Sequence, residues 1–302
     1  MFRREAVLSE QTITILATRW ENTMLLRHRD SGLHLLIDCG VYAPNVDRLC
    51  GMLEALGSSA DRVDAILMTH MHTDHYHAAG VQGLLDRRAP QRLPLPFHLH
   101  AEEPVVEPFD RERLALRRFD DAPFAMAAPS SSVTVIPVRM SHSAACCGFR
   151  IGDDYIGGDG PTKEVFGRRV MTLLGAFGGR PVRSLYVDLE AESVQTIRRA
   201  DIPDTRKKTM LESHGIATDV VEALARPQLR PFFAQLQRLV PMHVTPLVND
   251  ESGETNARLI REARDHHGFT FDVPVVPMGF QDVRGEAEPD TRGSRPPGRD
   301  EP

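Results

Sequence analysis

The chain of 302 residues contains few cysteines, no long apolar run and no excess of positive charge. Its four cysteines are Cys39, Cys50, Cys146 and Cys147, of which the first two lie apart and the last two are adjacent. This spacing matches neither a disulfide framework nor a zinc knuckle. We therefore expect all four to be small buried residues.

The lack of a long apolar run excludes a membrane-spanning helix, which needs ~20 consecutive apolar residues. The N-terminal sequence, Met-Phe-Arg-Arg-Glu-Ala-Val, begins with basic residues but has no apolar segment or cleavage site of a signal peptide behind it. We expect a cytoplasmic protein that has no membrane as a partner.

A net charge of −6 argues against broad, non-specific binding of nucleic acid, which requires a strongly basic surface. Local basic clusters are nevertheless present, and we interpret both as solvated surface. They are Arg111, Arg113, Arg117 and Arg118, and Arg206, Lys207 and Lys208. The hydrophobic content of 41% and the charged content of 26% are typical of a globular domain.

The hydrophobic pattern predicts both strands and helices. Strands are expected over residues 12–18, 22–27, 33–38, 65–69, 96–100, 133–138, 148–152, 155–158, 184–189 and 240–244. Helices are expected over residues 45–56, 163–177, 219–225, 231–239 and 254–265, and after the histidine cluster through Leu85. Residues 89–132 are rich in proline and charge, so apart from the strand at 96–100 we expect loops there and a mobile flap. Residues 1–283 are expected to form one domain, followed by a disordered tail over 284–302.

The strongest chemical signal is the segment Thr69-His70-Met71-His72-Thr73-Asp74-His75, directly after the buried strand at 65–69. Alternate residues of an extended backbone project to the same side, so His70 and His72 can bind one metal ion. If a helix begins near Thr73, Asp74 and His75 turn toward the position of a second ion. Imidazole and carboxylate are the standard ligands of zinc, so the segment predicts a metal centre.

This His-x-His-x-Asp-His segment resembles the signature of the metallo-β-lactamase superfamily. Other landmarks of that family follow in the right order between residues 12 and 279. Asp38, in Leu36-Ile37-Asp38-Cys39-Gly40, resembles the strand-ending aspartate that orients the ligand loop. The later landmarks are His142 in Ser141-His142-Ser143, Asp159 in Tyr155-Ile156-Gly157-Gly158-Asp159-Gly160, and His243 in Met242-His243-Val244. The resemblance implies an α/β fold, an αββα sandwich of two mixed sheets flanked by helices.

The resemblance also implies a ligand set for two divalent ions. His70, His72 and His142 would hold one ion, and Asp74, His75 and His243 would hold the other. Asp159 would bridge them. Zinc is the expected metal, with manganese or iron as alternatives, and a water acidified by the ions would attack the substrate as a metal-bound hydroxide.

Two further segments are similar to the phosphodiesterase side of the superfamily, which includes tRNA 3′-processing endonucleases, small bacterial DNA exonucleases and cyclic-nucleotide phosphodiesterases. They are Leu189-Glu190-Ala191 and Ser213-His214-Gly215. The resemblance implies that Glu190 and His214 flank the metals and that His214 assists the leaving group. Together with Asp74 they form the expected catalytic set, acting on a phosphodiester in a nucleic acid or in a cyclic or small nucleotide.

The sequence also departs from the family pattern. Thr18-Arg19-Trp20-Glu21-Asn22 replaces a glycine-rich turn, and the His214 segment reads Ser-His-Gly-Ile-Ala-Thr. A long Gly/Pro-rich insertion, which tRNA-processing members use to bind their substrate, is absent, so tRNA processing is disfavoured.

Other functions stay open on the same metal centre. They are hydrolysis of a thioester or a lactone, with β-lactam hydrolysis least favoured, and the redox chemistry of an iron-containing member. The intact ligand set argues against a metal-free scaffold, and whether the chain forms a homodimer is left open. His77 is expected at a solvent-facing helix position. His98, His100, His266 and His267 are set aside because no further ligands are expected near them.

Overall fold

Two mixed β-sheets packed face to face form the centre of the molecule in a computed structural model that describes residues 11–17, 21–176, 181–243, 248 and 254–275. The first sheet has the strand order β1-β2-β3-β4-β5-β6 and the second β12-β11-β10-β9-β8-β7. The first sheet comprises β1 (Gln11–Ala17), β2 (Thr23–His28), β3 (His34–Ile37), β4 (Ala65–Leu67), β5 (Leu95–His100) and β6 (Leu114–Phe119). The second comprises β7 (Phe124–Ala127), β8 (Ser132–Arg139), β9 (Cys147–Ile151), β10 (Asp154–Ile156), β11 (Ser184–Asp188) and β12 (Arg238–Met242).

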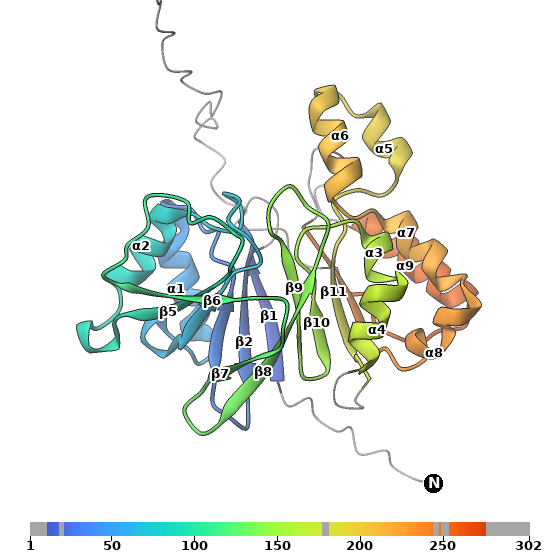
Figure 1. Ribbon diagram of the computed structural model, residues 1–302. Helices are drawn as coiled ribbons and strands as arrows, with labels where there is room; N and C mark the ends of the chain where they lie inside the picture. Colours follow the sequence, from blue (N-terminus) through green and yellow to red (C-terminus); the bar gives the residue numbers. More distant parts are fainter. Residues whose placement is uncertain (1–10, 18–20, 177–180, 244–247, 249–253, 276–302) are drawn as a thin grey trace, which may run out of the picture.

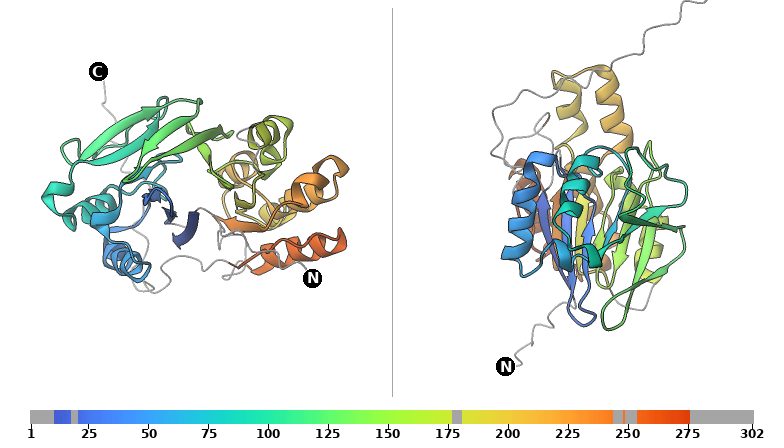
Figure 2. Two further views of the ribbon diagram at one scale, coloured as in Figure 1. Left: turned by 90° about the horizontal axis from the view of Figure 1, so that it is seen from below. Right: turned by 90° about the vertical axis from the view of Figure 1, so that its left-hand side faces the viewer.

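Helices cover the outer face of each sheet (Figure 1). Those beside the first sheet are α1 (Val46–Ala55) and α2 (Ala78–Asp86). Those beside the second are α3 (Thr162–Val165), α4 (Arg168–Ala176), α7 (Ala217–Leu224), α8 (Arg230–Phe233) and α9 (Glu254–His266). The remaining pair, α5 (Val194–Arg199) and α6 (Asp204–Ser213), stands out from one end of the sandwich in two perpendicular views (Figures 1 and 2). Among the described helices, none is long and apolar enough to cross a membrane.

The layers follow from the alternation of side chains along each strand. On β2, Leu25 packs toward α1 and α2, whereas Leu26 packs between the sheets with Phe149 and Ile151 of β9. Both faces of the sheets are therefore buried, which is why β3 and β4 are buried along their whole length. The predicted αββα sandwich is confirmed.

Strand direction brings distant parts of the chain to one edge. Strands β3 to β6 are parallel, and β8 runs in the same direction as β10, β11 and β12. The predicted metal ligands all follow the carboxyl ends of these strands, in the loop that begins at His70 on one sheet and at His142, Asp159 and His243 on the other. Asp38, which was expected to orient the ligand loop, lies at the same edge.

Several predicted elements were wrong. Residues 89–132 contain the strands β6 and β7 in addition to β5, and α5 and α6 were not predicted at all. The helix expected over 163–177 is split between α3 and α4, because Gly167 closes α3 with its N–H on Glu164 O, 2.9 Å away. The helix expected over 231–239 ends at Phe233, because Arg238–Met242 pairs with β11 instead. The predicted tail over 284–302 and residues 18–20 lie outside the described residues.

The ligand loop also differs from its prediction. A helix does not begin near Thr73, because α2 begins only at Ala78. The segment before it forms turns, in which the N–H groups of His75 and Tyr76 both donate to His72 O. His77 is not a solvent-facing helix residue but the N-cap of α2, accepting a hydrogen bond from Gly80 N at 3.4 Å.

Gly40 packs against this loop with no room for a side chain. A Cβ atom at Gly40 would lie 1.8 Å from the carbonyl oxygen of Asp74. Asn22 is linked to both segments, since its N–H donates to Asp74 O and its carbonyl accepts from Gly40 N. The backbone after β3 therefore fixes the position of the ligand loop.

We predict that Gly40→Ala lowers the free energy of unfolding by about 1–3 kcal/mol or more, because the added methyl group displaces the Asp74 backbone. Gly51→Ala is the matched control, since a Cβ there meets no atom within 4 Å and α1 would gain about 0.5–1 kcal/mol of helix propensity. Denaturant unfolding of both variants measures the difference. Equal stabilities would show that the loop is not held by this contact.

Candidate metal centre

The first donor group combines residues from both sheets. Donor atoms of His70, His72, His142 and Asp159 all lie within 4.8 Å of one another. His142 Nε2 is 3.1 Å from His72 Nδ1, and His70 Nε2 is 3.6 Å from Asp159 Oδ2. No described residue hydrogen-bonds to His70 Nε2, although this atom is fully buried. A buried imidazole nitrogen that faces other donors is what a metal ion requires.

The second donor group adjoins the first through Asp159. Donor atoms of Asp74, His75, Asp159 and His243 again lie within 4.8 Å of one another. His243 Nε2 is 2.8 Å from Asp74 Oδ2, and His75 Nε2 is 3.1 Å from Asp159 Oδ1. One carboxylate thus faces both groups, and the imidazole and carboxylate donors fit a pair of divalent ions.

Hydrogen bonds from neighbouring residues orient these donors. Asp38 accepts from the N–H and the hydroxyl of Thr69, both at 2.8 Å, and from His75 Nδ1 at 2.7 Å. His142 Nδ1 donates to Ser213 O at 3.2 Å. In both histidines the outer nitrogen is engaged, so Nε2 faces the centre.

Two non-glycine residues of the centre adopt a left-handed backbone conformation, Asp38 with φ 60° and His243 with φ 54°. Such conformations cost free energy for residues with a Cβ and persist where the surrounding contacts hold them. Asp38 has those contacts in Thr69 and His75, and His243 has one in Asp74. The backbone is therefore strained at both positions, and this conformation directs the two side chains to their partners in the centre.

Opposite charges stabilise each other inside the cluster. Burial alone would lower the pKa of His243, but Asp159 and the hydrogen bond to Asp74 raise it to about 10. Burial would likewise raise the pKa of Asp159, but His243, His75 and His70 hold it well below its ordinary value. The carboxylates remain ionised and favour bound positive charge, whether from protons or from metal ions.

His214 lies beside the second donor group. Its ring stacks on His243 with the centroids 4.9 Å apart, and its Nδ1 is 3.0 Å from Asp188 Oδ2 and 3.6 Å from Glu190 Oε2. All three side chains are buried, and Arg206 of α6 donates to Glu190 Oε1 at 2.9 Å. Asp188 also accepts from the N–H groups of Gly160 and Glu190.

Sequence reasoning missed three residues around the centre. Asp188 ends the buried strand β11 as Asp38 follows β3, and this shared position was a signal that could have identified it. Asn22 donates to Asp74 Oδ2 at 3.2 Å, and Glu103 accepts from the backbone of both ligand loops. Neither Asn22 nor Glu103 stands in a recognisable pattern.

The environments of His100 and Cys50 differ from those predicted. His100 lies with Asp121 and Cys147, their donor atoms within 4.8 Å of one another. The expectation that His100 has no potential ligands nearby was therefore wrong, but the Arg139 guanidinium is 3.3 Å from its ring and already supplies a positive charge. Cys50 is half-buried, whereas the other cysteines are buried as expected.

The two basic clusters are only partly solvated surface. Arg118 donates to the carbonyl groups of His100 and Glu103. Arg206 pairs with the buried Glu190.

Fold and donor groups together define a protein of the metallo-β-lactamase fold with a candidate centre for two divalent ions. A family model described as a Beta-lactamase superfamily domain matches residues 34–168, which include His70, His72, Asp74, His75, His142 and Asp159. Residues 34–168 therefore match a Beta-lactamase superfamily domain, and the chain as a whole has the metallo-β-lactamase fold.

Relatives of this chain are distant or partial. It is 40% identical over 76 residues to the Anti-Pycsar protein Apyc1 from Paenibacillus sp. (strain J14), which covers 24% of this chain and 26% of that protein. The chain thus matches about a quarter of the length of this relative.

Three solved structures share the fold over 89% of this chain. They are the metallo-beta-lactamase fold protein YhfI from Bacillus subtilis (17% identity, TM-score 0.58, 98% of that chain covered), a diphosphatase from the PhnP family (15%, 0.57, 96%) and unliganded yeast PDE1 (10%, 0.58, 98%).

We predict that Asp38→Asn weakens metal binding by about 10–100-fold, because an amide can present its N–H₂ group to His75 Nδ1 and favour the tautomer with hydrogen on Nε2. Competition with a chelator measures the affinity. Asp64→Asn is the matched control, since Asp64 also accepts a backbone N–H, from His34 at 2.9 Å. Equal affinities in both variants would contradict an orienting role for Asp38.

Proposed function

We propose that this chain is a dinuclear metal-dependent phosphodiesterase that acts on a nucleic acid or on a cyclic or small nucleotide. The observation that carries the proposal is the position of His214, stacked on the metal-site residue His243 and bonded to Asp188. Fold neighbours that are a diphosphatase and PDE1 support it, as does the local likeness to Apyc1.

The proposed centre has one set of ligands for each of two ions. We propose His70, His72 and His142 for the first ion and Asp74, His75 and His243 for the second, with Asp159 between them. Zinc is the first metal to test, followed by manganese and iron, because histidine and carboxylate donors accept all three. When bound, the two ions would acidify water and stabilise negative charge on the substrate's phosphoryl oxygens.

His214 is suited to protonate the leaving oxygen. Burial alone would lower its pKa, but Asp188, Asp159 and Glu190 raise it above the ordinary value for histidine. The raised pKa favours the protonated ring, and an alkoxide leaving from phosphorus needs that proton. Asp188 fixes Nδ1, which leaves Nε2 as the nitrogen that can donate.

Glu190 is a second carboxylate, beside Asp188, that lies close to His214 Nδ1. Its carboxylate is fully buried and is shared between His214 Nδ1, at 3.6 Å, and Arg206, at 2.9 Å. A thioester or lactone substrate has no need of this assembly, because the metal centre alone can serve acyl transfer. The Glu190–His214 arrangement therefore favours phosphodiester chemistry.

We expect the purified protein to release nitrophenol from bis(p-nitrophenyl) phosphate when zinc or manganese is added, and Asp159→Ala to lower kcat by about 10³-fold while the fold is retained. Asp74→Ala should behave in the same way. Asp47→Ala, which removes an exposed carboxylate paired with Arg87, should leave the rate unchanged.

Full activity in Asp159→Ala would overturn the dinuclear centre. If the wild-type protein hydrolyses thioesters or lactones and no phosphodiester, the substrate class is wrong. Coloured protein with stoichiometric iron and no hydrolysis would instead indicate a redox member of the fold.

His214→Gln should slow cleavage by about 10²–10⁴-fold for phosphodiesters with an alkoxide leaving group, and much less for those that release nitrophenolate, which needs no proton. The measurement is the ratio of kcat for the two substrates in each variant. His266→Gln, at an exposed position on α9, is the control. An equal loss on both substrates would argue against proton donation by His214.

A further inference from the structure

Glu103 connects the two loops that carry the three histidines of the first donor group. Its side chain is buried, with 3% of the residue exposed. Oε1 accepts from the N–H of Met71 at 2.9 Å, and Oε2 accepts from the N–H of Ala145 at 2.7 Å. Met71 stands between His70 and His72, and Ala145 lies three residues after His142, so one carboxylate is bonded to both loops.

The two loops belong to different sheets. The His70 loop follows β4 of the first sheet, and the His142 loop joins β8 to β9 of the second. A backbone hydrogen bond from Cys147 N to Thr69 O, of 3.1 Å, also links them. Besides this backbone bond, the loops are linked by the side chain of Glu103, which is not itself a donor to the first metal position.

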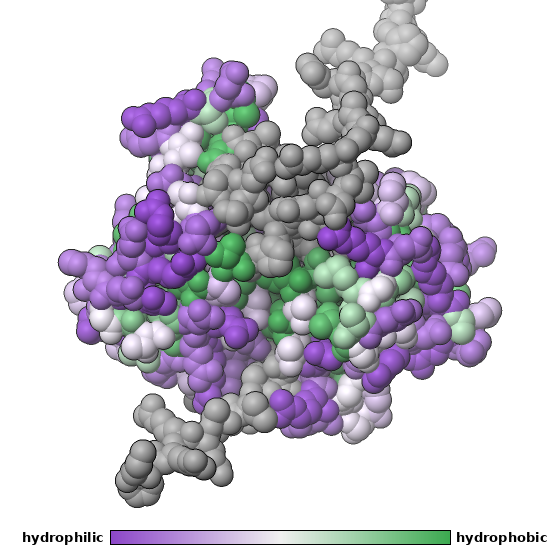
Figure 3. Space-filling view, turned by 180° about the vertical axis from the view of Figure 1, so that it is seen from behind, coloured by the Kyte–Doolittle hydropathy of each residue, from purple (hydrophilic) through white to green (hydrophobic). Residues whose placement is uncertain are grey.

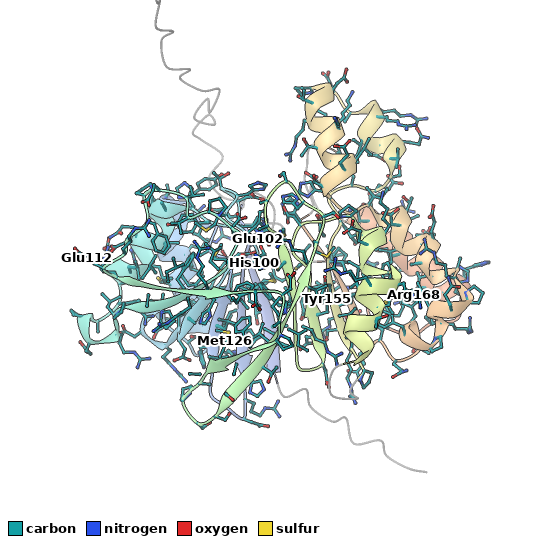
Figure 4. The ribbon with its side chains drawn as sticks, viewed as in Figure 1. His100, Glu102, Glu112, Met126, Tyr155 and Arg168 are labelled. Atoms are coloured by element: carbon teal, nitrogen blue, oxygen red, sulfur yellow. The ribbon has the colours of Figure 1, made fainter. Side chains whose placement is uncertain are left out.

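Glu103 is held in place from outside the centre. Arg118 of β6 donates to the carbonyl oxygens of His100 and Glu103, at 2.7 and 2.6 Å, and Glu103 N donates to His100 O at 3.1 Å. Figure 4 shows His100 and its neighbour Glu102 near the centre of the molecule, where the two halves adjoin. The buried carboxylate thus extends from an anchored turn, and its bonds to N–H groups are of the stronger, charge-assisted kind.

We propose that Glu103 is a positioning residue for the first metal site, setting the distance between the His70–His72 pair and His142. The proposal rests on the metal-binding part of the proposed function and does not depend on the substrate. In this proposal the turn after β5 connects the two sheets at the metal centre. Substitution of residues that orient ligands without touching the metal commonly lowers metal affinity about 10–100-fold.

The test compares Glu103→Gln and Glu103→Asp with the matched control Glu102→Gln. An amide at 103 can accept only one of the two N–H groups, and an aspartate is too short to reach both. Glu102 is the same residue type at the next position, but it is exposed and paired with Arg139 on the surface. Metal-free protein is titrated with zinc in competition with a chelator, which gives the number of sites and the affinity of each.

We expect two sites in the wild type and in Glu102→Gln. In both Glu103 variants one site should weaken at least tenfold and the other should change less than twofold. A structural contact unrelated to the metal would lower the melting temperature of the metal-free and metal-loaded forms equally. A positioning residue should instead reduce the rise in melting temperature that zinc causes, and this difference is measurable even in a destabilised variant.

Wild-type affinities at both sites in the Glu103 variants, with an unchanged zinc-induced rise, would overturn the proposal. If Glu103→Gln does not fold, Glu103→Asp keeps the negative charge and decides the question. Failure of the wild type to bind zinc, manganese or iron would instead refute the metal centre itself, so the two failures are distinguishable.

Discussion

The site depends on the interaction between the buried carboxylate of Asp159 and the imidazoles around it. It is 2% exposed and lies 3.1 to 3.6 Å from nitrogens of His75, His243 and His70, which reach it from both sheets. An isolated buried carboxylate would be costly, so it must be matched by positive charge. The two sheets therefore have to meet in a register that brings imidazoles to this point, and the left-handed backbone at Asp38 and His243 is part of meeting that demand.

The parts of this arrangement that could be predicted from the sequence are those in which one segment carries both the fold and the chemistry. The buried strand before His70 and the closely spaced donors after it identify a metal centre without any partner segment. The resemblance then supplied His142, Asp159 and His243, each following a strand, and the strand directions bring them to one edge. Whether they bind metal stays a prediction, since proximity of donors shows only that they can.

The parts that could not be predicted depend on contacts between segments far apart in the chain. β6 reads Leu-Ala-Leu-Arg-Arg-Phe and has no alternating pattern, because it is an edge strand that is held by pairing with β5. Glu103 lies in a proline- and acid-rich turn that resembles surface, and only the approach of both ligand loops buries it. The hairpin α5–α6 has a small apolar cluster of its own, around Ile197 and Met210, and is hydrophilic over its outer side (Figure 3).

These missed elements are the ones that adapt the common fold to a particular chemistry. The turn after β5 governs the metal side of the site through Glu103. In the proposed function the hairpin affects the side of the site at which the leaving group departs, because Arg206 of α6 donates to Glu190 and Glu190 lies against His214. Neither element contributes a metal ligand in the expected set, so each can vary without removing a donor from the centre. A substrate that contacts the hairpin would therefore act on the residues around His214, whereas the ligand loops are positioned by the strands that they follow and, in our proposal, by Glu103. Specificity in this chain should accordingly depend on α5–α6 more than on the metal centre, since function resides in the site attached to the fold rather than in the fold itself.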